Sequence, residues 1–148
     1  MTESLRKAFA GVVGAENLMT DPADLATYSC DAAVADPATP ALVVRPASGE
    51  GPAGTVRLCN ENRLPLTVRG AGANLGGETI PAEKGVVILT NGLNRIPEIN
   101  EADMYAVVQP GVVTAKFATA VEATGPFYPP GPGSQAASTL GSLDKELD

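Results

Sequence analysis

The sequence predicts an α+β protein that starts like an α/β fold, with a small parallel sheet, flanking helices and further strands. Apolar segments at 41–45 and 64–69 flank a helical stretch at 53–62. This β–α–β order makes the two strands parallel, with a right-handed crossover. Strand-like segments follow at 85–90 and 105–109. The 16 glycines and 13 prolines among 148 residues exceed ordinary usage, which indicates many loops rather than a helical bundle.

The first 40 residues read as a helical and irregular lead-in. Leu5, Ala8, Phe9 and Val12 recur at helical spacing, so an amphipathic helix should end near Gly14. After a short irregular stretch, residues 21–25 form a helical turn with Asp21 as N-cap and Pro22 in the first helical position. A proline-punctuated loop then runs to Pro40.

Hydrophobic spacing and glycine positions also predict the helices and strands after residue 40. Residues 41–45 are continuously apolar, as in strands buried on both faces. The helix at 53–62 should turn Val56 and Cys59 inward, although the glycines at 51 and 54 weaken its start. Residues 96–99 suggest a short edge strand. A helix at 114–124 ends at Gly125, with one face formed by Phe117, Ala120, Val121 and Thr124.

Composition and charge exclude several classes of protein. Hydrophobic residues make up 44% of the chain, enough for a core, and the length suits one domain or part of a larger one. A net charge of −7 without a basic cluster argues against a nucleic-acid or anionic-membrane surface. No long apolar segment follows the N-terminus, so we expect no signal peptide or transmembrane helix, and a cytoplasmic location.

Few residues are suited to catalysis or metal binding. Cys30 and Cys59 are too few and too far apart in sequence for a metal cage, and both should be reduced thiols. The chain contains no histidine, which removes the commonest general base and metal ligand. We therefore expect no metal and no complete catalytic site within these residues.

The most informative motif is a glycine-rich loop, residues 70–77, that directly follows the strand at 64–69. Glycines allow backbone N–H groups to turn toward an anion and let it approach closely, which is typical of phosphate-binding loops. The dinucleotide fingerprint G-x-G-x-x-G fails because Leu75 replaces its third glycine, and the P-loop pattern fails because Glu78 replaces its lysine. An ordinary glycine-rich turn between two strands is the alternative.

A second loop, residues 127–135, is too rich in proline and glycine for a helix or central strand. Stacked prolines preset the backbone and suit a wall against a flat ligand, whereas a flexible linker is the alternative. Residues 138–141 then offer hydroxyls, amides and another glycine.

Several motifs in order carry a family resemblance that covers the chain from about residue 28 to 141. They are Val44-Arg45-Pro46, Leu58-Cys59-Asn60-Glu61, Arg69-Gly70-Ala71-Gly72, Gly76-Gly77, Asn94-Arg95-Ile96, Val108-Gln109-Pro110-Gly111-Val112, Phe127-Tyr128-Pro129-Pro130 and Thr139-Leu140-Gly141. The sequence resembles the FAD-linked oxidases of the p-cresol methylhydroxylase (PCMH) and vanillyl-alcohol oxidase type. Within that family it is most similar to the glycolate oxidase flavin subunit and to D-lactate dehydrogenases.

The resemblance implies that the chain is a flavoprotein and that two walls hold FAD. The first wall, around the pyrophosphate, consists of Arg69, Gly70, Ala71, Gly72, Ala73, Asn74, Leu75, Gly76 and Gly77. The second wall consists of Pro129, Pro130, Ser134, Ser138, Thr139 and Gly141, with the turn Gln109-Pro110-Gly111 supporting the groove. The alternatives are that Arg69 forms a surface ion pair and that Gln109 only holds a turn.

The resemblance also implies that residues 41–148 are an incomplete PCMH-type FAD-binding domain, without its C-terminal remainder and substrate domain. The relatives oxidise a small 2-hydroxy acid, so we expect the FAD-binding portion of such an oxidoreductase, inactive by itself, with weak FAD binding or none and a tendency to self-associate. An iron–sulfur partner subunit is implied too. The alternative is a truncated, non-catalytic remnant or assembly module. Catalytic residues are unknown, and the sequence selects neither the substrate nor the electron acceptor.

Overall fold

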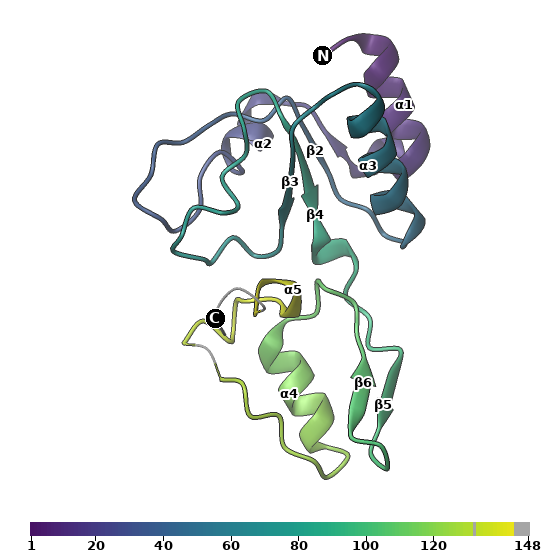
Figure 1. The fold of residues 1–148 in the computed structure, drawn as a ribbon, viewed down its shortest axis with the longest axis vertical. Coiled ribbons are helices and arrows are strands. Elements are labelled where there is room, and N and C mark those ends of the chain that lie inside the picture. The colour runs from purple at the N-terminus through teal and green to yellow at the C-terminus, as the bar shows by residue number, and fades with distance from the viewer. Residues whose placement is uncertain (132, 144–148) are drawn as a thin grey trace.

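The computed structural model describes residues 1–131 and 133–143. A four-stranded sheet with its helices forms the N-terminal part, and a two-stranded sheet with α4 and α5 forms the C-terminal part (Figure 1). In chain order the elements are α1 (Glu3–Val13), η1 (Ala15–Asn17), β1 (Leu18–Met19), α2 (Pro22–Ala26), β2 (Leu42–Val44), α3 (Glu50–Glu61), β3 (Leu66–Arg69), β4 (Val86–Leu89), η2 (Thr90–Gly92), β5 (Glu98–Asn100), β6 (Tyr105–Val107), α4 (Thr114–Glu122) and α5 (Leu140–Leu143).

The larger sheet has the strand order β1-β2-β4-β3. β4 is parallel to both β2 and β3, so these two strands are parallel to each other as predicted, but they are not neighbours. All four residues of β4 are buried, whereas Val68 in β3 is 55% exposed. The most apolar strand therefore takes a central position, because both of its faces are covered, and β3 takes the edge.

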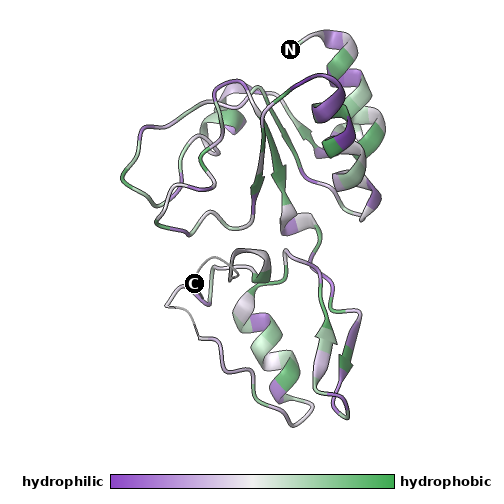
Figure 2. Ribbon diagram, viewed as in Figure 1, coloured by the Kyte–Doolittle hydropathy of each residue, from purple (hydrophilic) through white to green (hydrophobic). Residues whose placement is uncertain are grey.

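The side chains of the sheet alternate between two cores. On one face, Leu42, Val44, Val86 and Ile88 pack against Phe9, Val13 and Cys59 from α1 and α3. On the other face, Val43, Val87 and Leu89 pack against Leu25 from α2. The central strands carry the hydrophobic colour in Figure 2. Residues 1–40 thus contribute to both cores.

The predicted first and second helices are confirmed, the first with its end at Gly14 and the second with its N-cap Asp21. Thr2 accepts a hydrogen bond from the Leu5 N–H at 3.3 Å, and α1 ends at Gly14, whose φ is 90°. Asp21 caps α2, with its Oδ1 2.8 Å from the Ala23 nitrogen and Pro22 in the first turn. The sequence did not predict β1, which lies in the stretch expected to be irregular and pairs antiparallel with β2, nor the short helices η1, η2 and α5.

The third helix differs from its prediction in two ways. It begins at Glu50 rather than at residue 53. Its glycines lie in close contacts, since a Cβ on Gly51 would lie 2.7 Å from Pro46 Cβ, and one on Gly54 would lie 2.6 Å from Val12 Cγ1. The prediction that Val56 faces inward is wrong, since this side chain is 48% exposed. The buried stripe instead follows i, i+4 spacing through Gly51, Thr55 and Cys59, the last as predicted.

The C-terminal part contains the β5–β6 hairpin and α4. The predicted edge strand at 96–99 appears as β5, which pairs antiparallel with β6 in a sheet separate from the first. Phe117 and Val121 of α4 are buried as predicted, and Gly125, at φ 114°, follows the helix. Residues 127–131 and 133–135 have no helix or strand, as predicted. Within the described ranges, no helix combines the length and the apolar character needed to cross a bilayer.

Candidate functional site

The glycine-rich loop requires glycine at specific positions. Gly72 and Gly77 have φ values of 72° and 83°, which side chains disfavour. A Cβ on Gly72 would also lie 2.5 Å from the guanidinium carbon of Arg69. Of the other predicted loop residues, Ala71, Leu75 and Gly76 are exposed, and Gly70, Ala73 and Asn74 are half-buried. The loop thus needs glycine at 72 and 77 for its backbone conformation, and at Gly72 a side chain would also collide with Arg69.

Arg69 ends β3 and lies beneath this loop. The side chain is only 8% exposed, and its Nη1 donates a hydrogen bond to the carbonyl oxygen of Cys30 at 2.7 Å. Its Cζ is 5.7 Å from the centroid of the Tyr28 ring, within cation–π range. This burial does not fit the alternative of a surface ion pair. The guanidinium instead links the start of the loop to residues 28–30.

Asp31 is a functional candidate that sequence reasoning missed. Its Oδ2 accepts a hydrogen bond from Asn74 Nδ2 at 2.8 Å and lies 3.1 Å from Thr79 Oγ1, and its Oδ1 accepts one from the Ala33 N–H at 2.9 Å. Burial acts to raise the pKa of this carboxyl, but the hydrogen bonds from Ala33, Asn74 and Thr79 together hold it below its ordinary value. Contacts between residues more than 40 positions apart leave no local signal in a single sequence.

The second predicted wall approaches the first at Gly70. A Cβ there would collide with the Thr139 hydroxyl and would lie 3.3 Å from Ser142 Oγ. Thr139 is 3% exposed, and its N–H donates to Ser142 Oγ at 3.2 Å. Two segments some 70 residues apart in sequence therefore meet around Gly70, as Figure 1 shows for the region between β3 and α5.

The predicted turn at 109–111 adjoins the same segment. Gly141 donates its N–H to the Pro110 carbonyl at 2.9 Å, and Leu140 donates to Val112 at 2.9 Å. A Cβ on Gly111 would lie 2.7 Å from the Leu93 carbonyl oxygen, so this turn also needs glycine. Gln109 accepts a hydrogen bond from the Arg95 N–H through its Oε1 at 2.9 Å. Its side chain therefore holds the turn in place.

The remaining predicted residues lie apart from Gly70. Ser138 is 1% exposed, and its hydroxyl is 3.1 Å from Thr114 Oγ1 at the start of α4. The Ser134 carbonyl accepts the Ser138 N–H at 2.7 Å, which closes a turn. Pro130 is half-buried and Pro129 is exposed. The structure thus brings Gly70, Pro110, Thr139 and Gly141 into one region, and Ser138 contacts α4.

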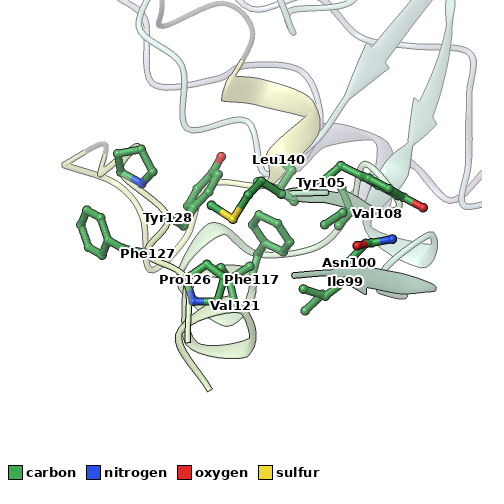
Figure 3. A pocket seen from close by; sticks show the side chains of 13 residues that line it. Ile99, Asn100, Tyr105, Val108, Phe117, Val121, Pro126, Phe127, Tyr128 and Leu140 are labelled. Atoms are coloured by element: carbon green, nitrogen blue, oxygen red, sulfur yellow. The ribbon is translucent and has the colours of Figure 1, made fainter. Parts of the chain in front are cut away.

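A separate cavity of about 520 Å³ lies between the β5–β6 hairpin, α4 and residues 126–129 (Figure 3). Its lining is mainly apolar, and the Phe117 and Tyr128 rings pack edge to face at 4.8 Å. Of the predicted site residues, only Pro129 lines it. This cavity contains no residue of the glycine loop.

Comparisons with known proteins identify the family of the chain. Residues 40–143 match the FAD binding domain family. The chain is 38% identical to glycolate oxidase subunit GlcD of Bacillus subtilis over 141 residues, which cover 95% of the chain and 30% of that relative. It is 34% identical to a D-lactate dehydrogenase of Anaerostipes hadrus over 106 residues, which cover 72% of the chain and 22% of the relative.

A solved structure supports the same assignment. p-Cresol methylhydroxylase with bound substrate superposes with a TM-score of 0.71 at 25% identity, over 82% of this chain and 24% of that structure. The chain thus spans less than a third of the proteins it matches. It belongs to the FAD binding domain family, with the PCMH-type fold of FAD-linked oxidoreductases related to glycolate oxidase and D-lactate dehydrogenase.

Proposed function

We propose that this chain is the FAD-binding portion of an oxidoreductase that acts on a small 2-hydroxy acid of the glycolate or D-lactate class. The observation that carries the proposal is the glycine loop, in which Gly72 combines a positive φ with close packing against the Arg69 guanidinium, where a Cβ would collide. Such a backbone suits a diphosphate held by main-chain amides. The match to an FAD binding domain supports FAD as the ligand.

The residues of this chain fit that cofactor. We assign the pyrophosphate to the glycine loop, residues 70–77, and a second contact to the segment that starts at Thr139, because the two adjoin at Gly70. With a net charge of −7, the chain offers main-chain N–H groups rather than a basic cluster for the phosphates. We assign Arg69 to shaping the loop, since its Nη1 is already bound to the Cys30 carbonyl.

The chemistry that FAD supplies when bound is acceptance of a hydride from the α-carbon of the acid, while a base takes the hydroxyl proton. We assign no residue of this chain as that base. The relatives extend well beyond the 30% or less that the chain matches, and we place the base and the groups that bind the substrate carboxylate there. The proposed domain division is a lead-in at 1–40 and a partial FAD-binding domain at 41–148.

The proposal extends to a multi-subunit assembly. The Bacillus subtilis relative is named a subunit of glycolate oxidase, which supports partner proteins. We include an iron–sulfur partner subunit among them as part of the proposal. Copurification of the assembly and its iron content would test this part separately from FAD binding.

Titration of the purified chain with FAD, followed by flavin fluorescence, tests the proposal. Wild-type chain should bind FAD with a Kd below about 1 mM, and Gly72→Val should weaken binding by at least about tenfold, because valine disfavours positive φ and collides with the Arg69 guanidinium that packs against the loop. Gly76→Val should have a smaller effect, since its Cβ would meet only the end of the exposed Glu78 side chain. Gly11→Val on α1, where a Cβ meets nothing within 4 Å, is the matched control. Absence of binding to wild type, or unchanged binding by Gly72→Val, contradicts the proposal.

A further inference from the structure

We propose that Asp31 is a positioning residue of the FAD site, whose carboxylate holds the glycine loop in the shape that receives the diphosphate. Asp31 lies outside residues 40–143, the segment that matches the family. The inference rests on the proposed function of the loop. It assigns to the lead-in a role in cofactor binding that neither the motifs nor the family match indicated.

The carboxylate contacts Asn74 within the loop and Thr79, two residues after the loop ends. Oδ2 accepts a hydrogen bond from Asn74 Nδ2 at 2.8 Å and from the Thr79 N–H at 3.4 Å, the latter near the limit for such a bond. Thr79 Oγ1 lies 3.1 Å from this oxygen and 3.0 Å from Asn74 Oδ1, so its single proton is shared between two acceptors. Asp31, Asn74 and Thr79 therefore form a closed triangle of polar contacts.

A second link joins the same lead-in segment to the start of the loop. The Cys30 carbonyl accepts the hydrogen bond from Arg69, whose guanidinium lies against Gly72. Residues 30 and 31 thus fix the loop at positions 69, 74 and 79, on either side of the glycines. A glycine-rich segment loses much conformational entropy when it is ordered, so fixed points of this kind decide whether the loop is ready to bind.

Charge distinguishes positioning from direct binding. A carboxylate close to a diphosphate repels it, and the Glu78 carboxylate, which also contacts Asn74, adds to this repulsion. Arg69 is the cation near this cluster, since its Nη1 donates to the carbonyl of Cys30, the residue before Asp31. If Asp31 acted only through its charge, removing that charge would tighten FAD binding. If Asp31 positions the loop, the same change weakens binding.

The experiment compares Asp31→Asn with the matched control Asp36→Asn, which changes an exposed aspartate of the same connecting segment. Two readouts are taken on the full chain: amide hydrogen exchange of residues 70–79 without FAD, and the FAD Kd from flavin fluorescence. We expect Asp31→Asn to speed exchange across the loop and to weaken FAD binding by about tenfold, since a carboxylate that accepts from several donors is lost. The control should change neither readout.

A reciprocal pair of substitutions tests the contact itself. Asp31→Asn combined with Asn74→Asp restores a carboxylate–amide pair with the roles exchanged, and we expect partial recovery of slow exchange and of FAD affinity. If Asp31→Asn does not fold, Thr79→Val, which removes one hydroxyl, should speed exchange at 70–79 to a smaller degree. Melting temperatures separate these local effects from global unfolding.

Wild-type exchange of the loop in Asp31→Asn overturns the inference, and so does tighter FAD binding by this variant. A wild-type chain that binds no FAD at about 1 mM contradicts the proposed function instead. In that case the exchange of the FAD-free chain still decides whether Asp31 holds the loop. The two failures are therefore distinguishable.

Discussion

At the scale of single residues, burial gives the two cysteines different chemistry. Cys59 is 2% exposed on α3, and burial raises the pKa of its thiol. Cys30 is exposed, and both are free thiols. Because the thiolate is the reactive form, an accessible cysteine reacts readily and a buried neutral one does not.

We expect a thiol reagent such as DTNB to modify Cys30 quickly in the native chain and Cys59 only after unfolding. Cys30→Ser should leave FAD affinity unchanged. Cys59→Ala should also keep it, but with a loss of about 1 kcal/mol in the free energy of unfolding, because a small buried side chain is removed. Fast modification of both thiols in the native state would show that α3 does not bury Cys59.

Asp31 makes stability depend on pH in the acid range. Its folded-state pKa is lowered, so the folded protein favours the ionised carboxylate more than the unfolded chain does. This contribution is therefore present above the unfolded pKa, about 3.9, and is lost as the pH falls through the lower folded value. Asp31→Asn should lower the free energy of unfolding at pH 7, and the difference from wild type should shrink below about pH 4. Urea unfolding at several pH values measures it, and a difference that grows on acidification would contradict the assignment.

At the scale of elements, α3 buries one polar side chain where it packs against the core. Thr55 is fully buried, and among the described residues its hydroxyl has no hydrogen-bond partner. A buried hydroxyl without a partner has lost its hydration without compensation. The glycines at 51 and 54 allow the close approach that creates this burial.

Thr55→Val should therefore stabilise the chain by about 1 kcal/mol, because valine has the same shape and no polar group to desolvate. Thr119→Val on the exposed face of α4 is the control, since its hydroxyl reaches only the Ala115 carbonyl. We expect it to change the free energy of unfolding by less than about 0.5 kcal/mol. A destabilised Thr55→Val in thermal or urea unfolding would mean that the hydroxyl is satisfied in solution.

At the scale of the whole molecule, the extent of the FAD site limits affinity. Tight ligand sites bury roughly 70–90% of the ligand. This chain spans 30% of glycolate oxidase subunit GlcD of Bacillus subtilis, so we expect it to supply part of such an enclosure. We predict a Kd for FAD weaker than about 1 μM and no turnover of 2-hydroxy acids by the chain alone. Stoichiometric sub-micromolar binding in the fluorescence titration would contradict this.

Apolar exposure near the cavity affects solution behaviour. Met104 is 72% exposed and Phe127 71% exposed, and both line the cavity beside the hairpin. Contiguous exposed apolar surface favours association. We expect the chain to self-associate in sedimentation velocity experiments and Phe127→Ser to shift it toward monomer. Val34→Ser is the control, because Val34 is fully exposed but does not line this cavity. Equal effects of the two substitutions would contradict a specific contact surface.

Local sequence signals were sufficient where short-range physics decides the structure. The cap at Asp21, the glycines that follow α1 and α4, and the four apolar residues of β4 follow from hydrogen-bonding side chains, glycine and burial. The glycine loop after β3 could also be located, because glycine is the residue that most readily adopts the positive φ found at Gly72 and Gly77. The direction of β2 and β3 followed from the β–α–β pattern.

Tertiary structure decided what depends on distant partners. β4 lies between β2 and β3 because the most apolar strand takes the position that is covered on both faces. Val56 points outward because α3 packs against α1 and the sheet through the stripe of residues that contains Thr55. Asp31 joined the candidate site only when the fold brought it to Asn74 and Thr79, whereas Thr139 was already predicted and only its contact with Gly70 came from the tertiary structure. The sequence determined where the chain can bend and pack, and it predicted where an anion would bind, because those properties belong to single residues and their neighbours. The contacts that hold the loop depend on the tertiary fold of the whole chain, and no local sequence pattern encodes those contacts.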